Sequence, residues 1–220
     1  MWFLVLMTSA AEGSDKGPYA IMRIAKIKSI RAGNKTKAHN ARQLPCYNAD
    51  PNISNTRISL TPEMKELEGK TFKEIFDERT QGQKIRKNAV YGIEVVMTYS
   101  PEAQIEGETA LQWAKKSIEW AAALFNKENI IDLVWHFDEQ TPHLHLTVIP
   151  IDSRGKLNAK AFLDGNAKRF EKLQDDYAAA VSEFGLKRGL PKEETKAKNK
   201  AARAWRAETA ARGILEDEPA

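Results

Sequence analysis

The stretch that decides the fold is Trp135-His136-Phe137-Asp138-Glu139-Gln140-Thr141-Pro142-His143-Leu144-His145. Apolar residues dominate on both sides of its polar centre, which predicts one strand over residues 130–137 and another over residues 144–151. The link between the two strands is short, and a short link joins neighbouring strands in antiparallel fashion. The stretch therefore predicts a hairpin within an antiparallel sheet.

Three histidines fall on one face of this hairpin. Side chains two residues apart on a strand share a face, so His143 and His145 point the same way while Leu144 and Leu146 point to the core. His136 ends the preceding strand, and the link folds it back beside the pair. Three imidazoles placed in this way form a facial set of nitrogen ligands with open coordination positions, which is typical of a catalytic metal.

The sequence of the hairpin does not decide which metal binds, nor which roles Asp138 and Glu139 have. Three of the chain's four histidines lie within ten residues, with Asp138 and Glu139 between them. Imidazole ligands suit zinc, copper, iron or nickel, whereas phosphate chemistry often uses magnesium or manganese. Either acid is a candidate fourth ligand, a partner that orients a histidine, or a base. Asp138 fits a simple turn residue equally well.

The rest of the pattern indicates an α+β fold with a central, largely antiparallel sheet and helices packed on it. Further strands are expected at residues 19–28 and 90–99. A break is expected at Gly33-Asn34, and a loop at residues 47–59. Helices are expected at residues 35–43, 61–76 with an interruption at Gly69, 108–127 and 159–184. The predicted core stripe of the third helix is Leu111, Ala114, Ile118, Ala121 and Phe125.

Composition narrows the class of protein. Of the 220 residues, 42% are apolar and 29% are charged, which excludes a disordered chain and allows a full core. A single cysteine, Cys46, excludes a disulfide framework and a multi-cysteine zinc site, and favours a reducing compartment. The apolar run at residues 1–7 is too short for a membrane span and lacks the basic start of a secretory signal. We therefore expect a cytoplasmic protein without a membrane span.

Positive charge is concentrated near the N-terminal side of the chain. The net charge is +4, yet residues 21–42 hold seven basic residues and no acidic one. Clustered Lys and Arg are what a phosphate-binding surface needs. Besides Arg42, the predicted phosphate-binding residues are Arg23, Lys26, Lys28, Arg31, Lys35 and Lys37.

The fourth histidine, His39, lies inside this acid-free window. A histidine can attack phosphorus and form a covalent protein–phosphate adduct. Arg42 lies three residues further on, so in a helix it shares the face of His39, where its bidentate fork could clamp a phosphate. The alternative is that His39 only contacts a phosphate or is an exposed polar residue.

The two ends of the chain differ from its centre. We expect residues 1–18 to be a disordered extension and residues 19–190 to be the folded domain. The final segment, residues 191–220, holds seven basic and six acidic residues and many helix-forming ones. We expect it to be a charged helical arm.

The pattern His136-x-Asp-Glu-x-Thr-Pro-His-x-His145 resembles the metal motif of the Mob/Pre plasmid mobilisation relaxases, the MobV group. Further segments are similar to the same family and follow its order over residues 19–189. These segments are Tyr19-Ala20-Ile21, His39-Asn40-x-Arg42, Lys87-Asn88-Ala89-Val90, Glu94-Val95-Val96, Val148-x-Pro150-Ile151-Asp152, Gly155-Lys156-Leu157 and Gly185-Leu186-Lys187-Arg188-Gly189. The metal motif is the specific one, and the others support it.

The resemblance implies that residues 19–190 form a relaxase domain of the HUH class, which is named for the pattern seen here as His143-Leu144-His145. Such enzymes nick one DNA strand at a plasmid transfer origin, stay covalently joined to its 5′ end and later rejoin it. The three motif histidines would hold a divalent cation, Mn²⁺ or Mg²⁺. The nucleophile would be His39, with Glu139 accepting its proton or orienting it.

The same resemblance implies the partners. The ligand would be plasmid DNA at a transfer origin, both hairpin and single-stranded, and other mobilisation or transfer proteins would take part. The basic window would follow the single strand, with Tyr47 or Trp135 as a stacking platform.

The chain departs from the family in two places. Asn55 stands where a histidine is usual, which bears on the preferred DNA sequence. The long C-terminal half common in the family is missing, so the chain would be a truncated relaxase or a short member. Homo-oligomerisation through that half would then be lost.

Three other functions remain open at this point. One is a replication initiator of the HUH class with Tyr47 as its nucleophile. Another is a metal-stabilised module that binds single-stranded DNA without catalysis. A metallohydrolase of small phosphoesters is disfavoured by the acid-free basic window.

Overall fold

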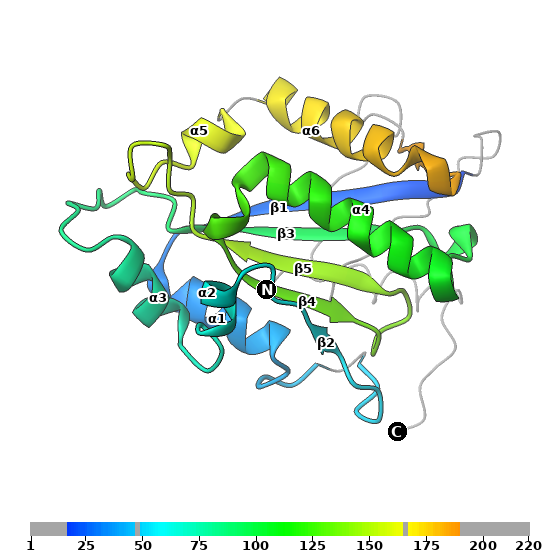
Figure 1. The fold of residues 1–220 in the computed structure, drawn as a ribbon, viewed down its shortest axis with the longest axis horizontal. Helices are drawn as coiled ribbons and strands as arrows, with labels where there is room; N and C mark the ends of the chain where they lie inside the picture. Colours follow the sequence, from blue (N-terminus) through cyan, green and yellow to red (C-terminus); the bar gives the residue numbers. More distant parts are fainter. Residues whose placement is uncertain (1–16, 47–48, 165–166, 190–220) are drawn as a thin grey trace, which may run out of the picture. The chain divides into compact units, whose positions relative to one another are not determined.

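A six-stranded sheet organises the residues that the computed structural model describes, which are 17–46, 49–164 and 167–189 (Figure 1). Its strand order is β2-β4-β5-β3-β1-β6. The strands are β1 (Tyr19–Ile27), β2 (Thr56–Arg57), β3 (Gly92–Tyr99), β4 (Ile130–His136), β5 (His143–Val148) and β6 (Lys187–Arg188). Every pairing is antiparallel except that of β1 with β6. The predicted α+β fold with a largely antiparallel sheet is confirmed.

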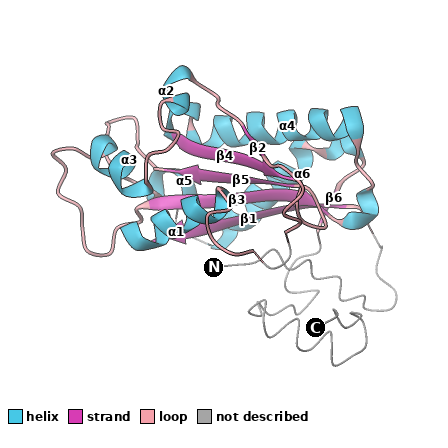
Figure 2. Cartoon of the chain, turned by 90° about the horizontal axis from the view of Figure 1, so that it is seen from below, coloured by secondary structure: helices cyan, strands magenta, loops and turns pink. Residues whose placement is uncertain are grey.

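Helices cover both faces of this sheet (Figure 2). The α-helices are α1 (Ile30–Asn40), α2 (Pro62–Lys65), α3 (Phe72–Arg79), α4 (Gly107–Phe125), α5 (Lys160–Leu163) and α6 (Ala167–Ala180). Short 3₁₀ turns are η1 (Pro101–Ala103), η2 (Lys127–Asn129) and η3 (Ser182–Phe184). The long helix α4 lies on one face of the sheet together with α6, which packs on β1. Helix α1 crosses the other face.

The start of α1 corrects one prediction. The helix begins at Ile30 rather than at residue 35, because the Ser29 hydroxyl oxygen accepts a hydrogen bond from the Ala32 amide and caps it. Gly33, the predicted break, lies inside the helix and is buried. A Cβ built at Gly33 would lie 2.2 Å from a ring atom of Phe72 in α3. The glycine at position 33 therefore allows α1 to approach α3 closely, and it does not mark the end of strand β1.

The interruption expected at Gly69 in the helix over residues 61–76 is confirmed, since α2 ends before Gly69 and α3 begins after it. Gly69 adopts the left-handed conformation (φ +83°), and Thr71 starts α3 anew with a capping box.

Three other predictions were wrong in detail. The helix expected at residues 159–184 is divided into α5 and α6. The expected loop at 47–59 contains β2, a strand too short to show a periodicity. Leu111 is 55% exposed, since the buried stripe of α4 is shifted to Ala110, Trp113, Ala114, Ser117, Ala121 and Phe125.

The two faces of β5 carry different residues. Leu144, Leu146 and Val148 are fully buried in the main core, which fills the space between the sheet and α4 and α6. The alternate residues His143 and His145 face the opposite side, where α1 lies. The predicted alternation is confirmed, and it places the polar residues of the hairpin on the α1 face.

Some predictions fall outside the described residues. The expected arm at 191–220, nearly all of the expected extension at 1–18, and Tyr47 belong to this group. The described residues form a compact unit from Gly17 to Gly189. Within this unit, none of the helices has the length and apolar content needed to cross a membrane.

Candidate metal centre and catalytic site

The three motif histidines converge on the α1 face of the sheet. His136 at the end of β4 lies opposite His143 at the start of β5, and His145 follows two residues later. One ring nitrogen from each lies within 4.8 Å of the others, and all three side chains are buried. The structure thus brings together the residues that the hairpin pattern predicted would share a face.

Two backbone carbonyls orient these rings. His143 donates its Nδ1–H to the carbonyl oxygen of Thr141 (2.9 Å), and His136 donates its Nε2–H to that of Asn40 (3.1 Å). These bonds leave Nε2 of His143 and Nδ1 of His136 as lone-pair donors. His136 Nδ1 is buried without a hydrogen-bond partner among the described residues. Histidines that bind metals commonly donate their second ring N–H in this way.

Burial keeps the three imidazoles neutral. It lowers the pKa of His136 to about 2, with further lowering by the neighbouring His145 and His143. Burial also lowers the pKa of His143 and His145. Neutral imidazoles offer the lone pairs that a cation needs. Three converging neutral donors, one of them buried without a partner, fit a divalent cation.

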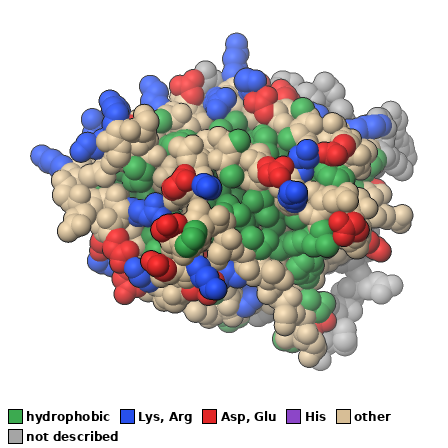
Figure 3. Space-filling view, in the orientation of Figure 1, with side chains coloured by type: hydrophobic (Ala, Val, Ile, Leu, Met, Phe, Trp, Pro, Cys, Tyr) green, Lys and Arg blue, Asp and Glu red, His purple; other side chains and the backbone are tan. Residues whose placement is uncertain are grey.

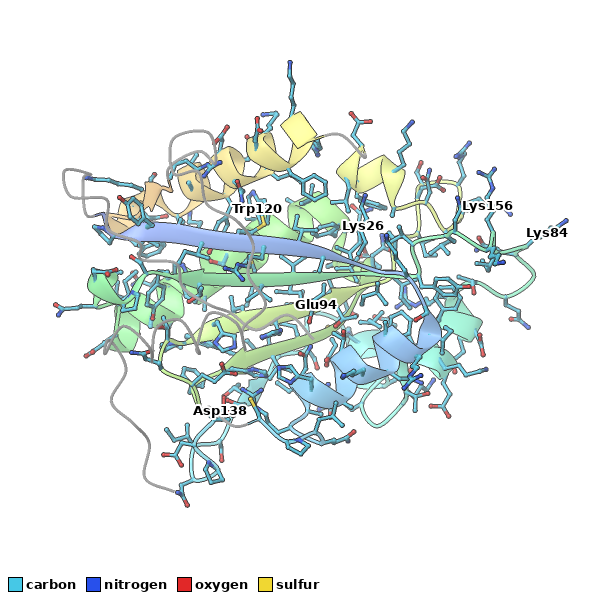
Figure 4. The ribbon with its side chains drawn as sticks, turned by 180° about the vertical axis from the view of Figure 1, so that it is seen from behind. Lys26, Lys84, Glu94, Trp120, Asp138 and Lys156 are labelled. Carbon is cyan, nitrogen blue, oxygen red and sulfur yellow. The ribbon has the colours of Figure 1, made fainter. Side chains whose placement is uncertain are left out.

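Glu94 belongs to this site, although from the sequence it was named only as part of the segment Glu94-Val95-Val96 and was given no role. It lies on β3, on the same sheet face as His145, and its Oε1 is 3.8 Å from His145 Nδ1 (Figure 4). Burial raises the pKa of this carboxyl group, against the lowering effect of His39. A charged residue within the otherwise apolar strand 90–99 was the available signal.

His39 lies beside the triad, as the predicted nucleophile should. It occupies the last turn of α1, and its ring centroid is 5.9 Å from that of His145 and 6.4 Å from that of His136. Burial lowers its pKa, and the positive charge of Arg42 lowers it further. The unprotonated, nucleophilic form of His39 is therefore favoured at neutral pH.

Arg42 holds the link of the hairpin against the end of α1. Its backbone adopts the left-handed conformation (φ +54°), and its Nε and Nη2 donate to the two carboxylate oxygens of Asp138, each at 2.6 Å. Nη2 also donates to Glu139 (2.8 Å), and Nη1 lies 3.5 Å from Nε2 of His39. The fork that was expected to clamp a phosphate is thus occupied by acids of the chain itself.

Asp138 does more than form a turn, because it anchors the hairpin link to neighbouring segments. Asn55 donates its Nδ2–H to Asp138 Oδ2 (2.8 Å) and accepts the Phe137 amide on its own Oδ1 (2.8 Å). Burial would raise the pKa of Asp138, but the hydrogen bonds from Arg42 and Asn55 outweigh it and lower the pKa to about 2. Asn55 therefore ties its own loop to the hairpin.

Glu139 lies at the edge of the triad. Its Oε1 accepts from Arg42 and lies 3.8 Å from His143 Nε2. His136, Asp138 and Glu139 form a second group whose ligand atoms lie within 4.8 Å of one another. Because Arg42 neutralises both carboxylates of that group, the histidine triad is the better cation site. The roles predicted for Glu139, as base or as orienting group, stay predictions.

The predicted phosphate-binding residues do not form one surface. Arg23 lies on the sheet face of the triad, since it pairs with Val96, which pairs with His145. The ammonium group of Lys26 instead lies over the ring of Phe170 in α6, on the other face. Lys37 is buried, with its Nζ 4.0 Å from Asp132. The remaining three, all exposed, are Lys28, Arg31 and Lys35.

Trp135, a predicted stacking platform, is in the wrong place for that role. It points into the main core, where its ring packs against Trp113 and Phe137, and it is 5% exposed. Strand alternation explains the error, because Trp135 faces the side opposite to His136.

The sequence of the chain is similar to those of known proteins. The sequence profile of the family Mob_Pre, plasmid recombination enzyme, matches residues 16–206. Plasmid recombination enzyme type 1 of Staphylococcus aureus is 30% identical over 200 residues, covering 87% of this chain and 49% of that protein. A 65 kDa protein of Zymomonas mobilis is 33% identical over 181 residues, covering 78% of this chain and 30% of its own length. The chain thus spans half or less of these relatives.

Solved structures share the fold. The Mn-bound MobM relaxase domain in complex with plasmid pMV158 oriT DNA superposes with a TM-score of 0.70 at 24% identity, covering 86% of this chain and 99% of that one. A second Mn-bound structure of the MobM domain, with a 23-nucleotide oriT DNA, gives a TM-score of 0.67 at 25% identity, with coverage of 87% and 98%. The family profile covers most of the chain, and the chain therefore belongs to the Mob_Pre family of plasmid recombination enzymes.

Proposed function

We propose that this chain carries the catalytic domain of a relaxase, which nicks and rejoins one DNA strand at a plasmid transfer origin through a covalent His39–DNA intermediate. The observation that carries the proposal is the position of His39 beside the triad, 5.9 Å between its ring centroid and that of His145. Family membership supports the same activity, and the MobM relaxase domain of similar fold binds oriT DNA.

His136, His143 and His145 would hold a divalent cation, Mn²⁺ or Mg²⁺. The manganese in the MobM domain favours Mn²⁺. When bound, the cation would neutralise the charge of the scissile phosphate. The carbonyls of Thr141 and Asn40 would keep the ring nitrogens of His143 and His136 turned toward it.

His39 would form the covalent bond. A ring nitrogen of its neutral imidazole would attack the phosphorus, so that a P–N bond forms while the P–O3′ bond breaks and the electron pair of that bond stays on the 3′ oxygen. The other ring N–H of His39 would give its proton to Glu139, which would pass it to the leaving 3′ oxygen. Arg42 would hold the His39 ring through the 3.5 Å approach of its Nη1 to Nε2. Rejoining would be the reverse attack of the 3′ hydroxyl, with no outside energy source.

The partners follow from the same proposal. The ligand would be origin DNA with a hairpin and a single-stranded part, within a cytoplasmic assembly that includes other transfer proteins.

One experiment tests this function as a whole. The purified chain is incubated with a supercoiled plasmid that carries a candidate origin, with Mn²⁺, with Mg²⁺ or with EDTA, and the products are separated under denaturing conditions. We expect an open-circular product and a protein–DNA adduct only with a divalent cation, and neither product with His143→Ala. Binding of single-stranded DNA without any adduct in Mn²⁺ would instead identify a non-catalytic module.

A further inference from the structure

An aspartate lies inside the buried strand that leads to the first motif histidine. Every residue of β4 is buried, and Asp132 is the one acidic residue in the strand. Aspartate is disfavoured in strands, and a buried carboxylate loses the hydration that stabilises its charge. Surface charges differ, as Figure 3 shows for one face of the molecule and as the Lys73–Asp77 pair, 60% and 55% exposed, illustrates. The position of Asp132 therefore calls for a specific explanation.

Three side chains from two other segments surround the Asp132 carboxylate. Lys37 and Asn40 come from α1: the Nζ of Lys37 lies 4.0 Å from Oδ1, and the Nδ2–H of Asn40 donates to Oδ2 over 3.5 Å. Arg57 comes from β2 and donates from Nη1 to Oδ1. Lys37 and Asn40 are buried, and because they lie three residues apart they share one face of the helix. Asp132 therefore contacts the face that α1 turns toward β4.

His39 lies between these two residues in the chain, in the last turn of α1. Successive residues of a helix are about 100° apart, so the His39 side chain leaves the helix about 100° away from that of Asn40. Its ring lies toward the triad, with 5.9 Å between its centroid and that of His145. A ring about 5 Å from the helix axis moves by about 2 Å when the helix turns by about 20°. The rotation of α1 about its own axis therefore decides where His39 points.

The two contacts described above act at the end of this helix. Arg42, which pairs with Asp138, lies beyond the last residue of α1, and the bond from His136 holds the backbone carbonyl of Asn40. The contacts of Asp132 act instead on the side chains of the face toward β4. Apolar residues of similar volume often replace a buried ion pair with no loss of stability. A directional contact, rather than stability, is therefore what the carboxylate adds.

We propose that Asp132 is a positioning residue for the nucleophile: by holding Lys37 and Asn40 it sets the rotation of the last turn of α1, so that His39 faces the scissile phosphate. Asp132 does not act on the cation directly, because it lies four strand residues before His136, about 13 Å between their Cα atoms. The inference rests on the proposed function in taking His39 as the nucleophile.

The test compares Asp132→Asn, which keeps the shape of the side chain and removes its charge, with Asp77→Asn as the matched control. Asp77 loses only an exposed pair with Lys73. The rate of adduct formation is measured in Mn²⁺ at neutral pH over a range of concentrations of a single-stranded origin oligonucleotide. Calorimetric titration gives the Mn²⁺ affinity without DNA. Two-bond ¹H–¹⁵N spectra of chain labelled with ¹⁵N-histidine, also without DNA, report on all four histidine rings.

We expect Asp132→Asn to form the adduct about tenfold or more slowly at saturating oligonucleotide, because a misplacement of about 1 Å can cost about 100-fold in rate. The half-saturating oligonucleotide concentration and the Mn²⁺ affinity should each stay within about threefold of the parent values. The His39 signals should shift or split, whereas those of His143 and His145 should stay in place. Asp77→Asn should match the parent chain in every measurement.

A second variant, Lys37→Met, keeps most of the side-chain volume and removes the charge on the helix. It should slow adduct formation as well, and the double variant should be no slower than the slower single variant, because both substitutions break the same contact.

An adduct rate of Asp132→Asn within about threefold of the parent overturns the proposal, as do unchanged His39 signals or single effects that multiply in the double variant. A loss of Mn²⁺ affinity equal to the loss of rate also overturns it, because the effect would then lie at the triad. If the parent chain itself forms no adduct, the proposed function fails, and the His39 signals alone decide whether Asp132 sets the position of that ring.

Discussion

Arg42 and Asp138 lie 96 residues apart in the chain and form a bidentate pair, with both N–O distances at 2.6 Å. The pair joins the end of the helix that carries His39 to the link of the hairpin that carries the triad. Both side chains are mostly buried, with 19% and 4% exposed. Together with the hydrogen bond from His136 to the Asn40 carbonyl, the pair therefore fixes the position of His39 relative to the three motif histidines.

Asn55 is expected to stabilise this arrangement. Asn55→Ala removes the bonds to Asp138 and to the Phe137 amide, and should lower the free energy of unfolding by about 1–3 kcal/mol. Urea unfolding of the purified chain checks the value. Asn52→Ala is the matched control, because Asn52 bonds only to Asp50 in an exposed turn. Equal effects of the two substitutions would contradict the role of Asn55.

Substitutions of Lys37 and of Lys35 should have different effects, the first on the stability of the fold and the second on DNA binding. Lys37 is buried near Asp132, so Lys37→Ala should lower the free energy of unfolding by about 1–3 kcal/mol with little change in the salt slope of binding. Lys35 is exposed on the same helix, and Lys35→Ala should leave unfolding unchanged. If Lys35 contacts a single strand, its removal lowers the salt slope by about 0.7. If Lys37→Ala instead lowers the salt slope and leaves unfolding unchanged, Lys37 is a DNA-binding residue after all.

The buried Asp132 predicts a pH dependence of stability. Burial raises its pKa, and the nearby Lys37 and Arg57 offset this only in part. A carboxyl group whose folded pKa is raised stabilises the fold below its unfolded pKa of about 3.9, and this stabilisation is lost as the pH rises through the folded pKa. The parent chain should therefore lose stability relative to Asp132→Asn as the pH rises above about 4. Unfolding in urea across this range measures the difference, and an opposite slope would refute the assignment.

Gly33 should control the position of α1. In Gly33→Ala the new Cβ would meet the Phe72 ring at 2.2 Å, so α1 or Phe72 must move. We expect a loss of about 1–3 kcal/mol in the free energy of unfolding, typical of overpacking, and reduced nicking because His39 moves with the helix. The exposed neighbour Ala32, substituted by Ser, is the control for helix propensity. A variant as stable and active as the parent chain would show that the contact is easily relieved.

The sequence contains some of these relationships but not others. A period of two residues was enough to place His143 and His145 on one face and Leu144 in the core, because strand alternation is local. The burial of Lys37 and the packing of Lys26 on Phe170 depend on which helix covers which face, and no local pattern shows that. The pairing of Arg42 with Asp138 is equally hidden, since it joins residues that only the finished sheet brings together.

Gly33 shows how a correct rule can mislead. Glycine usually interrupts a helix, but here it allows a close helix contact, which only the three-dimensional packing shows. Glu94 was missed for a related reason, since its neighbour His145 lies on another strand.

The central claim is that His39 carries the DNA, and the identity of the linked residue tests it most directly. His39→Phe and Tyr47→Phe are each incubated with origin DNA and Mn²⁺, the adduct is isolated under denaturing conditions, and the linked peptide is identified by mass spectrometry. We predict that His39→Phe forms no adduct, while Tyr47→Phe forms one whose DNA is attached to the peptide containing His39. An adduct that persists in His39→Phe and disappears in Tyr47→Phe would contradict the account and identify Tyr47 as the nucleophile.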